Sequence, residues 1–187
     1  MSQELKGINI AILVADGFEQ IEMTQPRQAY NDAGASTYII SPSGEQVQGW
    51  NHYDKADCFL VDLPLDKANP QDYDALLLPG GTVNPDQLRT NETAIKFIKA
   101  FFDAEKPVAA ICHGPWTLIE ADVVQGRKIT SWSSLKTDLT NAGATWVDES
   151  VVVDGNLITS RNPDDIPWFL NGSIALFSSQ KSRMQSV

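Results

Sequence analysis

Short, nearly unbroken apolar runs alternate along this chain with segments of helical pattern. The apolar runs cover residues 8–14, 36–40, 75–78 and 107–111. Strands that are apolar on both faces are typical of a parallel sheet covered by helices on its two sides. The repeated strand–helix order therefore predicts an α/β fold with a mainly parallel central sheet in a doubly wound arrangement.

Residues that start and stop helices support the helical segments between these strands. The expected helices cover residues 26–33, 92–104, 116–121, 135–142 and 163–177. Gly34 and Gly143 directly follow two of them, where a residue of left-handed conformation ends a helix. Asn162 can cap the last helix, with Pro163 in its first turn.

The 187 residues fit a single domain, and 42% of them are hydrophobic, which is enough for a core. We expect the core of this domain over about 7–177 and a polar, frayed tail over 178–187. Segments 47–63 and 145–160 are interpreted as added hairpin-like pieces. Asp154-Gly155-Asn156 is a suitable turn for the second piece.

Charge and hydropathy exclude several classes of partner. The net charge of −10 argues against binding to nucleic acid, which needs a basic surface. No run of about 18 apolar residues occurs, so no membrane segment is expected. The N-terminal residues are polar and lack the apolar region of a secretory signal. We therefore expect a cytoplasmic protein whose two cysteines remain thiols.

Residues 111–115, with the sequence ICHGP, form the junction between the fourth apolar run and a helix. A sharp turn at the carboxyl end of a parallel strand projects its side chain into the crevice where ligands bind. Cys112 is therefore the candidate nucleophile, with Gly114 in the turn. The start of the following helix predicts a depressed thiol pKa. The alternative is that Cys112 is a buried small hydrophobe, as we expect for Cys58 in the strand-like segment 56–63.

An acidic turn follows the first strand. Glu19 and Glu22 are three residues apart and would share one face of a short helical turn before Pro26. A carboxyl group beside a thiolate in a partly dry crevice should have a raised pKa and donate a hydrogen bond to the sulfur. The alternative role is to stabilise the positive end of a helix dipole. We favour the functional role for Glu22, and both roles remain open for Glu19.

Two glycines, Gly80 and Gly81, follow the third apolar run. Glycines at this place let the backbone approach a ligand, and their N–H groups could stabilise an oxyanion. Turns also require glycine, so the pair alone does not indicate a ligand site. Its position beyond a core strand favours one.

His113 is next to the candidate nucleophile, but adjacent side chains usually point in different directions. We therefore expect it to bind substrate, or to be oriented by a carboxylate, rather than to reach the sulfur as a base. No histidine follows residue 113, which excludes the later His–acid pair of glutamine amidotransferases. His52 has no motif around it, no zinc-binding spacing occurs, and no Gly-rich phosphate or dinucleotide loop is present. No metal or cofactor is expected.

Six segments together resemble the PfpI family of intracellular cysteine peptidases and general stress proteins. These segments are VADGFEQIE, DALLLPGG, PVAAICHGP, QGRKITSW, NAGATWVD and TSRNPDD, which run in order from about residue 7 to 177. The family is related to the parkinsonism-associated deglycase within the class I glutamine amidotransferase-like superfamily. The resemblance implies a flavodoxin-like three-layer sandwich with a nucleophile elbow.

The resemblance also implies roles for particular residues. Cys112 would be the nucleophile with His113 beside it, Glu22 the acid bonded to the sulfur, and Glu19 a further pocket residue. Gly81 would supply an oxyanion N–H. In similar oligomers an acidic residue after the glycine loop comes from a neighbouring subunit and orients the histidine. Asp86 lies at about that position, in a loop one residue longer than in the archaeal peptidases, and Trp132 replaces a tyrosine.

Peptidase, glyoxalase III and deglycase activities are the ones that the resemblance implies. A narrow crevice suits a small dicarbonyl or its adduct, so the first hypothesis is cofactor-free attack of Cys112 on a glyoxal-type dicarbonyl or on its amino-acid or protein adduct. His113 and Glu22 would move protons, and water would release a hydroxy acid. The second is a redox sensor or chaperone-like protein whose Cys112 becomes a sulfinate held by Glu22 and backbone N–H groups. A homo-oligomer, at least a dimer, is expected in either case.

Overall fold

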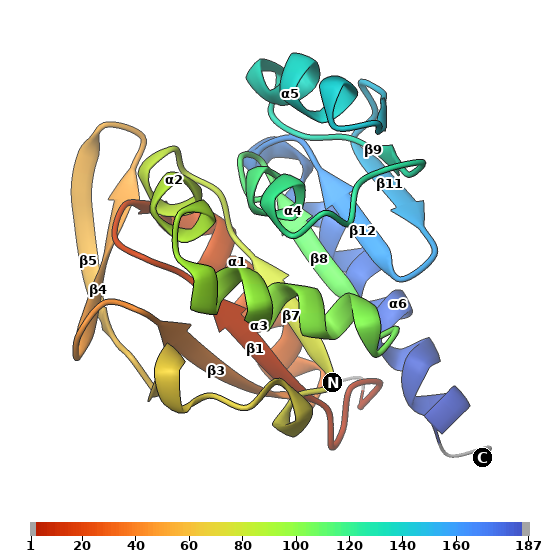
Figure 1. Cartoon of the computed structure of the whole chain (residues 1–187). Helices are drawn as coiled ribbons and strands as arrows, with labels where there is room; N and C mark the ends of the chain where they lie inside the picture. Colours follow the sequence, from red (N-terminus) through yellow and green to blue (C-terminus); the bar gives the residue numbers. More distant parts are fainter. Residues whose placement is uncertain (1–2, 185–187) are drawn as a thin grey trace.

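A computed structural model describes residues 3–184 of the chain, and its centre is a seven-stranded sheet (Figure 1). The strands of this sheet are β1 (Asn9–Leu13), β3 (Ser36–Ser41), β6 (Leu63–Pro64), β7 (Ala75–Leu78), β8 (Val108–Ile111), β11 (Val151–Asp154) and β12 (Leu157–Ser160). They lie in the order β11-β12-β8-β7-β1-β3-β6. All neighbours pair parallel except β11 and β12, which are antiparallel. The predicted mainly parallel central sheet is confirmed.

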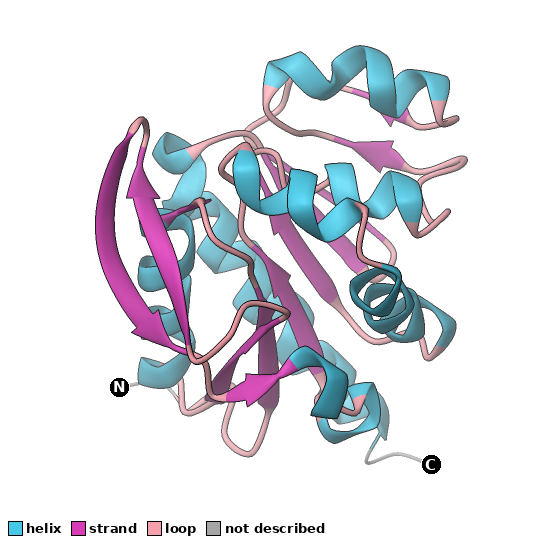
Figure 2. Ribbon diagram, turned by 60° about the vertical axis from the view of Figure 1, so that its left-hand side comes forward, coloured by secondary structure: helices cyan, strands magenta, loops and turns pink. Residues whose placement is uncertain are grey.

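Helices cover both faces of the sheet, as the apolar strands require. Alternate residues of β1 point to opposite sides, so that Ile10 and Ile12 belong to one buried cluster and Ala11 and Leu13 to another. The first cluster lies under α1 (Gln20–Asp32) and α6 (Ile166–Met184). The second lies under α2 (Val83–Arg89), α3 (Glu92–Asp103), α4 (Trp116–Glu120) and α5 (Lys136–Asn141). The result is the expected flavodoxin-like three-layer sandwich (Figures 1 and 2).

Two small sheets flank this sandwich. Strand β2 (Phe18–Glu19) pairs with β4 (Gln46–Asn51), which forms a hairpin with β5 (Asp54–Leu60). This β4–β5 hairpin, expected within 47–63, stands at one side of the molecule (Figure 2). The second small sheet pairs β9 (Lys128–Ile129) with β10 (Thr145–Trp146). Short 3-10 turns complete the chain: η1 (Leu65–Lys67), η2 (Pro70–Asp72), η3 (Ser133–Leu135) and η4 (Pro163–Asp165).

Several helix and strand predictions differ from the structure. Helix α1 begins at Gln20 and continues through Pro26, instead of starting there. Burial of Glu22, Met23, Pro26 and Tyr30 on one face holds the helix together across the proline. The sequence does not predict helix α2, because a proline usually interrupts a helix. The proline of α2 lies among its first residues, and the first turn of a helix tolerates a proline.

The second hairpin-like piece also has a different place from the one expected. Its strands β11 and β12 do not form an appendage but join the main sheet, where β12 lies beside β8. The turn between them is at Gly155-Asn156, as predicted.

The C-terminal segment is more regular than its polar composition suggests. Asn162 accepts a hydrogen bond from the Asp164 N–H, as expected of a cap, and α6 then continues to Met184. The prediction of a frayed tail is therefore wrong for 178–184, and 185–187 lie outside the described residues. Within residues 3–184, no helix combines the length and the apolar character needed to cross a membrane.

Candidate active site

Cys112 lies in the sharp turn that the sequence predicts after β8. Its backbone adopts φ +61°, a left-handed conformation that costs a non-glycine residue about 1–2 kcal/mol. Backbone hydrogen bonds hold this conformation on both sides. The Cys112 N–H donates to the Ser160 carbonyl at 3.0 Å, and its carbonyl accepts from the Trp132 N–H at 2.9 Å. The Gly114 N–H then closes the turn on the Ile111 carbonyl at 2.9 Å.

The glycine loop after β7 packs directly against this turn. A Cβ atom on Gly80 would lie 2.6 Å from Glu22 Oε2 and 2.7 Å from the Cys112 Cβ. Gly81 has φ +76°, and a Cβ there would meet the Glu19 amide nitrogen at 2.7 Å. Only glycine allows the loop to approach the acidic turn and the elbow this closely. The three strand ends therefore converge as predicted.

Glu22 is fully buried on the first turn of α1, and its carboxyl group lies against the elbow. Its Oε2 accepts a hydrogen bond from the Gly80 N–H at 2.8 Å. Burial raises the pKa of Glu22 to about 8, against the lowering effect of hydrogen bonds with Gly80 and with the Cys112 thiol. The carboxyl group is therefore mainly protonated at pH 7, as the sequence analysis expected.

The pKa of Cys112 differs from the expectation. Its side chain is buried, with 6% of the residue exposed, and burial raises the thiol pKa well above its usual value. The Glu22 carboxylate would raise it further, whereas N–H groups of Gly81 and His113 hydrogen-bond to the sulfur and lower it. The prediction of a depressed pKa is wrong because α4 has only five residues and starts four positions after Cys112. A helix dipole acts within its first turn.

His113 reaches the sulfur, contrary to expectation. Its Nδ1 lies 3.2 Å from Cys112 Sγ, because the left-handed turn removes the alternation that separates neighbouring side chains in a strand. Its Nε2 lies 3.3 Å from Ser134 Oγ. Burial lowers the pKa of His113 to about 4. The imidazole is therefore neutral at pH 7, and its Nδ1 lies within hydrogen-bonding distance of the thiol.

A pocket of about 270 Å³ opens in front of these groups. Its walls combine the elbow, the acidic turn, the glycine loop and the tip of the β4–β5 hairpin. The lining residues are Glu19, Glu22, His52, Tyr53, Gly81, Thr82, Cys112, His113, Trp132 and Pro163. The volume suits a small molecule or a single side chain rather than a folded protein.

The hairpin tip supplies residues that the sequence analysis missed. His52 has φ +55°, its N–H donates to Glu19 Oε2 at 3.1 Å, and its Nδ1 lies 3.8 Å from the same oxygen. This contact places Glu19 at the pocket wall, beside the exposed Tyr53. No local motif marks His52 or Tyr53, because their role depends on how the hairpin folds back over the acidic turn.

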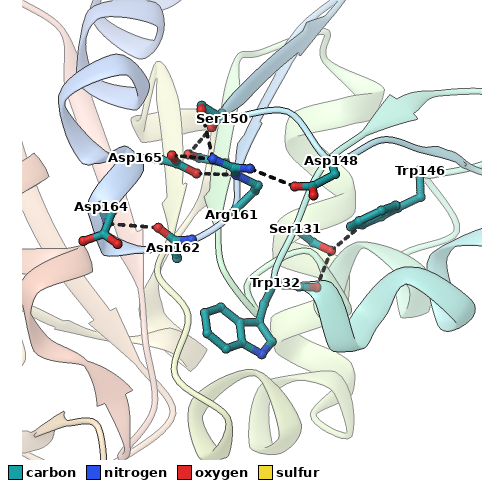
Figure 3. A network of polar contacts seen from close by, with 10 residues as sticks. Ser131, Trp132, Trp146, Asp148, Ser150, Arg161, Asn162, Asp164 and Asp165 are labelled. Carbon is teal, nitrogen blue, oxygen red and sulfur yellow. Dashed lines mark hydrogen bonds and ion pairs between the residues drawn. The ribbon is translucent and has the colours of Figure 1, made fainter.

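An ion-pair network around Arg161 lies near Trp132 (Figure 3). Arg161, directly after β12, donates to both carboxylate oxygens of Asp165, at 2.8 and 3.0 Å. It also donates to Asp148 at 2.8 Å and to Ser150 Oγ at 3.0 Å. Because Asp165 is buried at the start of the last helix, Arg161 ties that helix to the segment before β11.

Trp132 covers the face of the catalytic histidine candidate. Its ring is stacked on the imidazole of His113, with 5.9 Å between centroids and 25° between planes, and Trp116 makes a tilted contact at 6.4 Å. Asp86, by contrast, is exposed in the first turn of α2 and does not line the pocket of its own chain. Cys58 lies in β5 as expected, but its thiol is exposed and hydrogen-bonds to Gln48 Oε1 at 3.4 Å. Across residues 3–184, no three His, Cys, Asp or Glu side chains are grouped so that they could hold a metal ion.

Comparisons with known proteins show what the chain is similar to. The chain is 45% identical over 168 residues to "Putative cysteine protease YraA" of Bacillus subtilis, covering 89% of this chain and 96% of the relative. It is 43% identical over 159 residues to the deglycase TK1284 of Thermococcus kodakarensis, covering 85% and 93%.

A solved structure shows the same fold. It is a two-domain protein of Anabaena variabilis with DJ-1/ThiJ/PfpI-like and ferritin-like domains, and it superimposes with a TM-score of 0.83 and 33% identity. The superposition covers 90% of this chain and 47% of that one, so the likeness concerns about half of the longer protein. The model of the DJ-1/PfpI family matches residues 8–176, and the chain belongs to this family.

Proposed function

We propose that the protein is a cofactor-independent cysteine enzyme that acts on glyoxal-type dicarbonyls or on their amino-acid and protein adducts. One observation carries the proposal: Cys112 Sγ lies 3.2 Å from the Nδ1 of a neutral histidine, at a pocket of small-molecule size. A thiol with a raised pKa becomes a nucleophile when an adjacent base takes its proton during attack. His113 is that base.

The proposed reaction begins with a bond between Cys112 Sγ and the aldehyde carbon. The thiol proton moves to His113 Nδ1 and then to the aldehyde oxygen, which gives a hemithioacetal. Transfer of a proton from this carbon to its neighbour, through an enediol and His113, gives a 2-hydroxy thioester. Water adds at the thioester carbon, the sulfur recovers its proton, and the 2-hydroxy acid leaves. One carbon is oxidised and its neighbour reduced, so no external oxidant is needed.

Adducts would reach the same hemithioacetal by a different first step. Attack of the sulfur on an aminocarbinol carbon displaces the amine, which leaves with the proton that His113 received from the thiol. The neutral Glu22 carboxyl stabilises the sulfur while it is negative, and the nearby Gly81 N–H is placed to stabilise a developing oxyanion. A relative named as a deglycase supports adducts as substrates, and a relative named as a putative cysteine protease supports a cysteine nucleophile.

Steady-state assays on methylglyoxal, a glycated amino acid and a fluorogenic peptide test the proposal. We expect turnover of the first two, a loss of at least about 10⁴-fold in Cys112→Ala, and no change in Cys58→Ala. Cleavage of the peptide without turnover of the other two substrates would indicate that the substrates are peptides. Turnover that survives in Cys112→Ala would contradict the proposed nucleophile.

The second candidate function is a redox sensor, favoured by the groups around the sulfur. The N–H groups of Gly81 and His113 and the carboxyl of Glu22 all lie close enough to the Cys112 side chain to shift its pKa, and they could equally hold the oxygens of a sulfinate. Two equivalents of hydrogen peroxide would supply the oxygens. Each peroxide transfers one oxygen atom to the sulfur and leaves as water. Retained protection of peroxide-stressed cells by a variant without turnover would favour this function.

We also propose that the protein works as a homo-oligomer in which Asp86 lies near a neighbour's His113. The exposure of Asp86 and its absence from its own pocket are compatible with such a role. Light scattering should give at least a dimer. A mixture of Asp86→Ala and Cys112→Ala should recover part of the lost activity after subunit exchange through hybrid sites, and a monomeric mass would contradict the shared site.

A further inference from the structure

Ser134, in the turn η3, contacts the edge of His113 that faces away from the nucleophile. Its Oγ lies 3.3 Å from His113 Nε2, while His113 Nδ1 lies 3.2 Å from Cys112 Sγ. A neutral imidazole carries one proton, so one ring nitrogen donates and the other accepts. Which nitrogen carries the proton decides whether His113 can act as a base toward the thiol.

The two possible tautomers have different consequences at these distances. With the proton on Nε2, this nitrogen donates to Ser134 Oγ and the lone pair of Nδ1 faces the thiol. With the proton on Nδ1, this N–H donates to the sulfur, and no base faces the thiol. The Ser134 hydroxyl can accept from Nε2–H or donate to Nε2, so both tautomers satisfy both contacts, but only the first leaves a base facing the thiol.

The turn that carries Ser134 is fixed by the elbow itself. The Trp132 N–H donates to the Cys112 carbonyl at 2.9 Å, and the Leu135 N–H donates to the Trp132 carbonyl at 3.1 Å. Ser131 Oγ donates to that same carbonyl at 2.8 Å and accepts from Trp146 Nε1 at 2.9 Å (Figure 3). The side chain of Leu135 is buried. This single turn therefore places the Trp132 ring on the face of the imidazole and the Ser134 hydroxyl at its edge.

We propose that Ser134 is a positioning residue of the same chain, which holds the His113 proton on Nε2 and keeps Nδ1 available to the Cys112 thiol. The inference rests on the proposed role of His113 as the base. During attack the thiol proton moves to Nδ1, and the Nε2–H of the resulting imidazolium stays hydrogen-bonded to Ser134 Oγ. Ser134 thus contributes a contact to His113 from within the same subunit.

Alkylation of Cys112 by iodoacetamide tests this role without depending on any substrate. The rate constant at Cys112 is measured at pH 7 by mass mapping, with Cys58 of the same molecule as the reference. We expect Ser134→Ala to lower it about 3- to 10-fold, the loss of one neutral hydrogen bond. Ser134→Thr, which keeps a hydroxyl, should restore it, and Ser133→Ala in the same turn should leave it within twofold. Equal rates in Ser134→Ala and Ser133→Ala would overturn the proposal.

The ¹⁵N chemical shifts of His113 give a second readout, which reports the tautomer directly in the unmodified protein. A protonated Nε2 and an unprotonated Nδ1 at pH 7 are expected, with a mixture of tautomers in Ser134→Ala. A protonated Nδ1 in the unmodified protein would overturn the assignment. A failed turnover assay with these alkylation and NMR results intact would contradict the proposed substrates and not the role of Ser134.

Discussion

The chain holds two cysteines in two contrasting settings, the elbow after β8 and the β4–β5 hairpin. Cys58, in the hairpin, is exposed, and its thiol donates a hydrogen bond to the amide oxygen of Gln48. Cys112, in the elbow, is buried, but three elements bring an acid, backbone N–H groups and an imidazole to its sulfur. Exposure gives Cys58 access to reagents, whereas surrounding groups give Cys112 a means of losing its proton.

The comparison indicates how a buried cysteine can be a nucleophile without a low pKa. Burial disfavours the isolated thiolate, and the neutral Glu22 adds no charge at pH 7. In the proposed mechanism the neutral His113, with a pKa of about 4, accepts the proton only as the sulfur attacks. The elbow would then protect its thiol until a carbonyl carbon is in place.

The largest expected effect concerns Glu22 and the pH dependence of stability. The folded protein keeps this proton up to about pH 8, whereas the unfolded chain loses it near 4.5, so the folded state binds more protons between these values. The free energy of unfolding should therefore fall as pH rises from 5 to 8, by up to roughly 4 kcal/mol from this group. Glu22→Gln should remove that contribution in urea unfolding at pH 5, 6.5 and 8.

Glu45→Gln, next to the hairpin and exposed, is the matched control for this measurement. Its unfolding curves should keep the pH dependence of the unmodified protein. Parallel pH dependence in Glu22→Gln would show that Glu22 does not carry the proton. Glu22→Leu should additionally remove the hydrogen bond to Gly80 and alter the thiol titration, whereas Glu22→Gln keeps a neutral donor.

The next effect isolates the base. His113→Gln should slow alkylation of Cys112 by about 100-fold at pH 7, the usual scale of general-base assistance. Cys58 in the same molecule should react within twofold of its normal rate, because it does not depend on His113. Equal slowing of both cysteines would indicate a global change, and no slowing at Cys112 would remove His113 from the mechanism.

The smallest effect tests the crowding at the elbow. In Gly80→Ala the new methyl group would meet Glu22 and Cys112 at under 3 Å, and we expect a loss of about 2 kcal/mol in the free energy of unfolding. Gly44→Ala, before the hairpin, meets no atom within 4 Å and should change stability by less than about 0.5 kcal/mol. Thermal unfolding of both variants makes the comparison, and equal stabilities would contradict the packing of the three strand ends.

The sequence predicts what local patterns determine. The apolar runs locate β1, β3, β7 and β8, and the ICHGP junction locates the elbow, because these features depend on neighbours in the chain. The roles of Cys112 and Glu22 as a pair follow from the common edge of parallel strands. The continuation of α1 through Pro26 and the place of β12 beside β8 depend on tertiary packing and were not predicted.

The electrostatics of the site were harder to predict than its composition. A helix start predicts a low thiol pKa, but burial, which only the folded protein defines, is the larger effect at Cys112. The contact between His113 and the sulfur arises from the left-handed backbone conformation of Cys112, which no local sequence pattern predicts. Ser134, His52 and Tyr53 reach the site through turns distant in sequence, without a motif of their own.

The pH profile of alkylation at Cys112, with Cys58 as internal reference, tests the central claim most directly. If the neutral His113 takes the thiol proton during attack, the rate constant at Cys112 should be nearly constant between about pH 5 and 7.5, above the pKa of His113 and below that of Glu22. A thiol that must first ionise in solution gains about tenfold in rate for each pH unit below its pKa. A tenfold rise per pH unit at Cys112 would contradict the account.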